Sequence, residues 1–224
     1  MNKRNLLINA LIKYLAGFVI ICIILFLPAG TMNYANGWLF IALLFVPMFI
    51  LGLVLFIKSP ELLEKRLKSK EQRGKQSTVV KLAALAFILS FLMAGVDYRF
   101  ALTQVPQILV ITASVMLLLS YGIYAEVMRE NAYLSRTIEV QENQKVIDTG
   151  LYGIVRHPMY MATIFLFLSI PLVLGSWISF VIMLSYPAVI IARIKDEEIL
   201  LEKELQGYKE YKNKVKYRLI PLIW

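Results

Sequence analysis

The sequence has 224 residues, of which 59% are hydrophobic and only 17% are charged. An ordinary soluble domain has roughly 25% charged residues, so this composition excludes that class of protein. The net charge of +9 at pH 7 is compatible with nucleic-acid binding, but the positions of the basic residues indicate a membrane instead.

Six apolar segments follow one another along the chain and predict membrane-spanning helices. Four of them reach about 18 residues or more with their flanks, the length that a hydrocarbon core of about 30 Å requires. The last two are shorter and are joined only by Leu174, Gly175 and Ser176, so together they predict a tight antiparallel hairpin through the membrane. The segments are 14–27, 38–57, 82–96, 108–127, 159–174 and 177–192.

The first apolar segment follows a basic start, as the corresponding part of a secretory signal peptide does. Pro28-Ala29-Gly30 is a poor cleavage sequence, so we expect the segment to be retained as the first helix. The single cysteine, Cys22, lies within it, and the sequence therefore predicts neither a disulfide framework nor a zinc site.

The basic residues predict how the chain crosses the membrane. If the N-terminus is cytoplasmic, Arg99 is the one exception among 24 Lys and Arg residues, and all the others fall on the cytoplasmic side. This asymmetry is typical of membrane proteins. The sequence thus predicts a multi-pass protein of the cell membrane with both termini cytoplasmic, and some of the charge can hold anionic lipid headgroups.

Polar chemistry is concentrated in the second half of the chain. We therefore expect residues 1–127 to form a four-helix transmembrane scaffold, and residues 128–224 to carry the function. The second region should consist of a cytoplasmic segment, a helical hairpin over 158–194 and a cytoplasmic tail. The expected fold is an all-α integral membrane protein with about six transmembrane helices and a C-terminal cofactor-binding segment.

The most informative motif lies at the start of the fifth apolar segment. Pro158 suits the first turn of a helix, where its missing N–H costs nothing, so Arg156 and His157 stand immediately before that helix. The backbone amides at a helix N-terminus already favour an anion. Adding two basic side chains makes this point strongly attractive to anions.

The opposite arrangement occurs at the end of the sixth segment, where Glu197 and Glu198 lie at a helix end that disfavours acids. In a hairpin that turns at Gly175, a residue numbered i lies level with about residue 350 minus i. The sequence therefore predicts that five side chains converge at the inner edge of the membrane. These are Arg156, His157, Tyr160, Arg193 and Glu197.

Physical chemistry alone leaves two interpretations of this convergence about equally favoured. The charged groups could form an ion-pair lock between two spans, or they could bind a ligand. A metal site is the weaker hypothesis, since the chain has one histidine and no nearby cysteine.

The spaced motif resembles a known family. Gly150-x-Tyr152-x-x-x-Arg156-His157-Pro158-x-Tyr160 is followed by Arg193-x-x-x-Glu197-Glu198 and then by Gly207-Tyr208-x-x-Tyr211. This pattern, over roughly residues 121–224, resembles the isoprenylcysteine carboxyl methyltransferase and phospholipid methyltransferase family. The resemblance implies a membrane-embedded methyltransferase that encloses S-adenosyl-L-methionine with its last helices and C-terminal segment, without a Rossmann domain.

The resemblance also implies roles for individual residues. Arg193 would face the methyl acceptor as the catalytic group. In place of the family's usual His-x-Leu-Val stretch, residues 144–147 are Gln-Lys-Val-Ile, so only the backbone role of that stretch carries over. The residues expected to bind the cofactor are Gln144, Lys145, Val146, Ile147, Tyr152, Arg156, His157, Pro158, Met159, Tyr160, Glu197 and Glu198.

The expected partners are membrane lipids and a lipophilic acceptor, which could be an isoprenylcysteine-like carboxylate, a lipid amine or a thiol. No nucleic acid is expected, and the oligomeric state stays open. One rival hypothesis is a nicotinamide-dependent membrane reductase of the sterol reductase type, although such proteins have more spans. Another is a non-enzymatic transporter or assembly factor, which would need ionisable groups near the bilayer midplane; the fifth and sixth segments have none.

Overall fold

The computed structural model describes residues 3–67, 74–134 and 140–224, which form helices and connecting segments without strands. The elements are α1 (Lys3–Ala29), α2 (Ala35–Lys58), α3 (Pro60–Leu67), α4 (Gly74–Phe100), α5 (Gln107–Glu130), the short 3-10 helix η1 (Gly150–Gly153), α6 (Pro158–Val173), α7 (Trp177–Met183), α8 (Ser185–Glu204) and α9 (Tyr208–Lys214).

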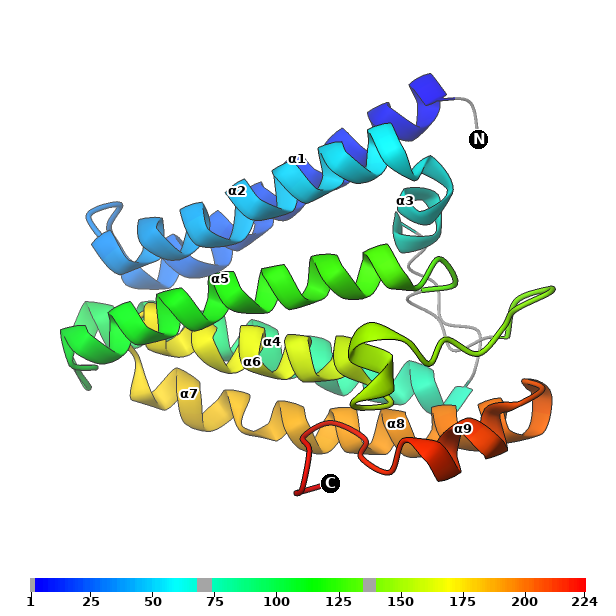
Figure 1. Ribbon diagram of the computed structural model, residues 1–224. Helices are drawn as coiled ribbons and strands as arrows, with labels where there is room; N and C mark the ends of the chain where they lie inside the picture. Colours follow the sequence, from blue (N-terminus) through cyan, green and yellow to red (C-terminus); the bar gives the residue numbers. More distant parts are fainter. Residues whose placement is uncertain (1–2, 68–73, 135–139) are drawn as a thin grey trace.

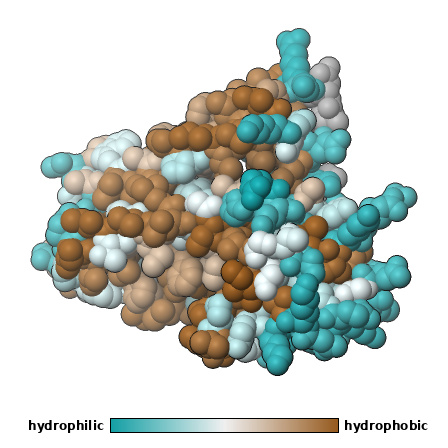
Figure 2. Space-filling view, viewed as in Figure 1, coloured by the Kyte–Doolittle hydropathy of each residue, from teal (hydrophilic) through white to brown (hydrophobic). Residues whose placement is uncertain are grey.

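The long helices form a bundle, with the short helices α3, η1 and α9 near one end of it (Figure 1). Helix α5 packs along α6, and α4 packs along α1 and α7. Apolar residues cover most of the length of the bundle, while hydrophilic residues gather at the end that carries the short helices (Figure 2). This distribution is expected of helices whose sides face lipid and whose ends face water.

Among the described residues, five helical segments are long and apolar enough to cross a membrane. They are α1, α2, α4 from Val80 to Phe100, α5, and the α7–α8 segment Trp177–Glu204. The remaining apolar segment, the fifth in the sequence, is the shorter α6, whose 16 residues extend about 24 Å. The expected all-α integral membrane fold is confirmed, with α6 packed between the longer helices.

A polar network fixes the turn between α6 and α7. Asp97 is buried and accepts hydrogen bonds from the Thr103 amide at 2.7 Å and the Ser176 hydroxyl at 2.5 Å. Ser176 in turn caps α7 by accepting a hydrogen bond from the Ser179 amide at 3.1 Å. Gly175 provides the left-handed backbone conformation that the turn requires, with φ of +82°. Because this end is fixed, the start of α6 and the end of α8 meet at the opposite end.

The second arm of the hairpin is broken at Leu184, which separates α7 from α8. Pro187 in the first turn of α8 lacks the N–H that would continue the hydrogen bonds of α7, and this explains the break. Beyond the apolar run, α8 continues to Glu204 and so carries Arg193, Glu197 and Glu198 on one regular helix.

Candidate functional site

The site begins where the chain enters α6. Pro158 occupies the first turn of this helix, as the sequence predicts. The two residues before it pair with the C-terminal tail: the Arg156 amide donates to the Tyr217 carbonyl and the His157 amide to the Arg218 carbonyl, both at 2.9 Å. This pairing holds the tail against the start of α6, beside α8 (Figure 1).

Glu198 lies at the centre of a buried ionic cluster. Its Oε1 accepts a hydrogen bond from Arg156 Nε at 2.8 Å and lies 3.3 Å from His157 Nε2, and its Oε2 accepts from Arg218 Nε at 2.9 Å. Arg156 also donates through Nη1 to the carbonyls of Val215 and Lys216, at 2.7 and 2.8 Å. Since the side chains of Arg156 and Glu198 are each only 4% exposed, these groups satisfy one another and lock α6, α8 and the tail together.

Glu197, the neighbouring acid, lies in a different set of contacts. Tyr160 donates its hydroxyl hydrogen to Glu197 Oε2 at 2.5 Å, and Arg193 Nε donates to the same hydroxyl at 2.9 Å. The Tyr160 hydroxyl thus links an acid and a base that are one helical turn apart on α8. His157 packs its ring against that of Tyr160, with centroids 5.7 Å apart.

Several of these side chains border a cavity of about 110 Å³. The sequence-predicted residues that line it are Gln144, Lys145, Val146, Ile147, Tyr152, Arg156, His157, Met159, Tyr160, Arg193 and Glu197. Pro158 and Glu198 lie beside the cavity and do not line it. The five side chains expected to converge therefore meet at one place, although Arg156 is also held by Glu198.

The cavity has further lining residues that were not among those expected to bind the cofactor: Asn131, Tyr133, Leu134, Leu201, Leu205, Tyr208 and Tyr211. Asn131 Nδ2 donates to the Tyr152 hydroxyl at 2.9 Å, and the Tyr211 hydroxyl donates to the Tyr152 carbonyl at 2.7 Å. Tyr208 and Tyr211 belong to the last part of the quoted motif. The spacing of these two tyrosines could have predicted that both line the site, because residues three apart on a helix lie on the same face.

The hydroxyl of Tyr208 is buried and has no hydrogen-bond partner in the described part of the chain. Burial raises the pKa of Tyr208 well above its ordinary value, and Glu198 and Glu197 add to this effect. Burial likewise raises the pKa of Tyr211. Both hydroxyls are therefore neutral at physiological pH, and the Tyr208 hydroxyl retains a hydrogen that no described group accepts.

Residues 102–206 match the sequence model of the phospholipid methyltransferase family. The match confirms the resemblance to this family of membrane methyltransferases. It covers α5, η1, α6, α7 and α8, the helices that contribute Tyr152, Tyr160, Arg193 and Glu197. Helix α9, with Tyr208 and Tyr211, lies beyond the matched residues.

The chain is also similar in part to a sterol reductase. The chain is 30% identical over 91 residues to the Delta(14)-sterol reductase TM7SF2 of Mus musculus. The match covers 39% of this chain but only 22% of that reductase. The similarity is thus confined to a small part of the larger protein.

Proposed function

We propose that this protein is a membrane methyltransferase that uses S-adenosyl-L-methionine to methylate a lipophilic acceptor. One observation carries the proposal: an acid, a base and several tyrosines from separate elements face one cavity, most of them in the family-matched region. Glu197 and Arg193 come from α8, Tyr160 from α6 and Tyr208 from α9.

The donor and acceptor groups of the cavity suit this cofactor. S-adenosyl-L-methionine carries a carboxylate, an ammonium, a sulfonium and an adenosine, so its site must offer both signs of charge. Lys145 and His157 can meet the carboxylate, while Glu197 can meet a positive group. The unpaired Tyr208 hydroxyl offers a hydrogen bond, and the tyrosine rings offer faces for a cation.

When bound, the cofactor supplies an activated methyl group for in-line displacement by a lone pair of the acceptor. The chain's contribution is mainly positioning, because such a transfer needs the reactants close, aligned and shielded from water. Tyr160 holds Glu197 and Arg193 in fixed relative positions through its hydroxyl. The Glu198 cluster joins the start of α6 to α8 and to the tail, which keeps the lining residues of α6 and α8 in place.

Arg193 is the proposed contact for the acceptor. On α8 it lies one turn before Glu197, about 6 Å nearer the apolar part of the helix. An arginine there can orient an isoprenylcysteine-like carboxylate through its planar fork. For a lipid amine or thiol acceptor, Arg193 would act on a neighbouring anionic group instead.

Two wider proposals accompany this one. We propose that residues 1–127 form a scaffold that shapes the acceptor's path, and that residues 128–224 carry methyl transfer. The charge asymmetry supports a cell-membrane protein with both termini in the cytoplasm, so the cavity would open to cytoplasmic S-adenosyl-L-methionine.

The similarity to the sterol reductase supports one alternative, a reductase that binds a nicotinamide cofactor in the same cavity. Calorimetric titration of the purified protein separates the two. We expect S-adenosylhomocysteine to bind and reduced nicotinamide nucleotides to give no heat of binding. Binding of a nicotinamide nucleotide alone would overturn the proposed function.

A further inference from the structure

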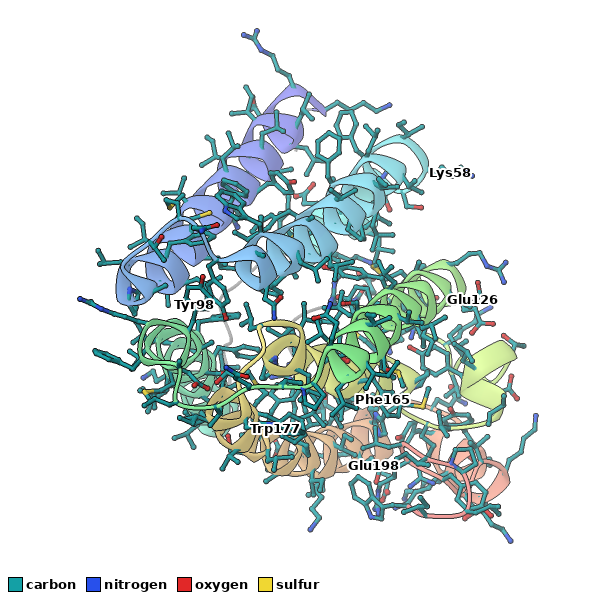
Figure 3. All side chains as sticks on the ribbon, turned by 90° about the vertical axis from the view of Figure 1, so that its left-hand side faces the viewer. Lys58, Tyr98, Glu126, Phe165, Trp177 and Glu198 are labelled. Atoms are coloured by element: carbon teal, nitrogen blue, oxygen red, sulfur yellow. The ribbon has the colours of Figure 1, made fainter. Side chains whose placement is uncertain are left out.

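A second cavity, much larger than the first, opens where the ends of α2, α3 and α5 meet. It has a volume of about 860 Å³ and lies at the hydrophilic end of the bundle. Lys58 at the end of α2 and Glu126 on α5 border it from two sides, and both lie toward the same side of the molecule in Figure 3. We refer to this space as the α2–α5 groove.

One part of the groove is apolar and belongs to helices that cross the membrane. Leu51, Val54 and Leu55 of α2 face Gly122 and Ala125 of α5. A Cβ atom placed on Gly122 would meet no other atom within 4 Å, so the groove is open at that point. An apolar space of this kind between spans is filled by lipid chains, because water gains nothing by entering it.

The other part of the groove is polar and carries both signs of charge. Arg129 and Glu126 pair with each other at 2.5 Å, so their charges offset. The other charged residues that line the groove are two basic ones, Lys58 and Lys65, and one acidic one, Glu61. The excess of positive charge beside an apolar wall is complementary to a lipid with an anionic headgroup.

The polar part of the groove lies next to the first cavity. Tyr133 lines both spaces. Lys65 Nζ donates to Gln141 Oε1 at 2.6 Å, and Gln141 Nε2 donates to the Tyr133 carbonyl at 2.5 Å. A headgroup held at Lys65 therefore lies close to Tyr133, which borders both the groove and the proposed methyl-donor site.

We propose that the α2–α5 groove binds an anionic phospholipid of the inner leaflet and is the route by which the acceptor reaches the methyl donor. The lipid chain lies along α2 and α5, and the phosphate lies at Lys58 and Lys65. The role as an acceptor route rests on the proposed function, whereas the lipid site stands on the groove itself.

Photocrosslinking tests the apolar half of the proposal. The purified protein is placed in phosphatidylcholine bilayers containing a small share of phosphatidylglycerol with a photoreactive acyl chain, and the labelled peptides are identified. We expect labelling of α2 and α5 around Leu55 and Gly122. Gly122→Phe should reduce it at least about tenfold by filling the open space, since a phenyl ring occupies the volume of several chain carbons.

The matched control is Gly52→Phe. Gly52 also has open space around its Cβ position, but it lines a different apolar cavity, between α1 and α2. In this variant the photoreactive lipid should label α5 to the same extent as in the unsubstituted protein. Equal labelling of α5 in Gly122→Phe and in the unsubstituted protein would refute the site.

A charge reversal tests the headgroup half. Lys58→Glu should lower labelling by phosphatidylglycerol about fivefold, because one basic residue near a bilayer contributes about 1 kcal/mol to anionic lipid binding. Lys81→Glu, on the exposed face of α4, should have little effect. Photoreactive phosphatidylcholine, whose headgroup has no net charge, should label the groove weakly in every variant; equal labelling by the two lipids would contradict the proposed preference for an anionic headgroup.

Titration with S-adenosylhomocysteine distinguishes this inference from the proposed function. Gly122→Phe and Lys58→Glu should both keep the affinity of the unsubstituted protein, which also shows that they fold. If lipid labels the groove but S-adenosylhomocysteine does not bind, the lipid site stands and the methyltransferase role fails. If S-adenosylhomocysteine binds but no lipid labels the groove, the further inference fails alone.

Discussion

Two adjacent glutamates on α8 have different surroundings and should behave differently when substituted. Glu198 pairs with the buried Arg156 and with the partly exposed Arg218, so Glu198→Gln leaves the buried Arg156 without its carboxylate counter-charge. Removing one member of a buried ion pair costs about 3 to 5 kcal/mol, and we expect a large fall in melting temperature. Thermal unfolding of the detergent-solubilised protein measures this.

Glu197→Gln should instead act on the ligand. We expect the melting temperature to change little and S-adenosylhomocysteine affinity to fall roughly 30-fold, as when one partner of a buried charged contact is lost. Calorimetry provides the affinity. Normal affinity in this variant would place the cofactor elsewhere and leave the charged groups as a structural lock.

Tyr208 and Tyr211 provide a matched pair for the C-terminal wall of the cavity. The Tyr208 hydroxyl lacks a partner among the described residues, so Tyr208→Phe should raise stability by about 1 kcal/mol and weaken S-adenosylhomocysteine binding about fivefold. Tyr211→Phe removes the hydrogen bond to the Tyr152 carbonyl and should lower stability. The proposed contact with Tyr208 is wrong if Tyr208→Phe leaves affinity unchanged.

Arg193 separates acceptor binding from cofactor binding. Arg193→Ala should abolish methyl transfer while keeping S-adenosylhomocysteine affinity within a few fold, because its proposed contact is the acceptor. Arg193→Lys should lose nearly as much methyl transfer if Arg193 holds an acceptor carboxylate through two hydrogen bonds. A large loss of S-adenosylhomocysteine affinity in Arg193→Ala would make Arg193 a structural partner of Tyr160 and Glu197.

At the scale of elements, the apolar runs predicted the helices and the hairpin, because the lengths of spans and turns are local properties of the chain. The geometry of the hairpin alone was enough to predict that Tyr160 lies close to Arg193 and Glu197. The pairing of Arg156 with Tyr217 was beyond prediction, since it joins residues far apart in sequence through an irregular tail. The break at Leu184 had a local signal in Pro187, but an apolar run of that length was read as one span.

The close packing of α1 against α4 depends on Gly95. A Cβ atom at this position would lie 2.5 Å from the Leu25 carbonyl oxygen, which belongs to the backbone of α1. Gly95→Ala should therefore separate the helices and cost about 1 to 3 kcal/mol, seen as a lower melting temperature. Gly17→Ala, where the space is open, should be neutral or slightly stabilising; equal effects of the two substitutions would contradict the account.

At the scale of the whole molecule, the proposed topology can be tested with single cysteines. After Cys22→Ser removes the single cysteine, Asn33→Cys should react with a membrane-impermeant maleimide added to intact cells. Lys203→Cys should react only after the cells are opened, because we place the end of α8 in the cytoplasm. Labelling of Lys203→Cys from outside would reverse the orientation.

The central claim is methyl transfer to a lipophilic molecule, and label transfer tests it most directly. The purified protein is reconstituted with a lipid extract and given S-adenosyl-L-methionine labelled in its methyl group, and the organic phase is then counted. We predict label in the organic phase with the unsubstituted protein and background counts with Glu197→Gln. Background counts for both, or equal label for both, would contradict the account.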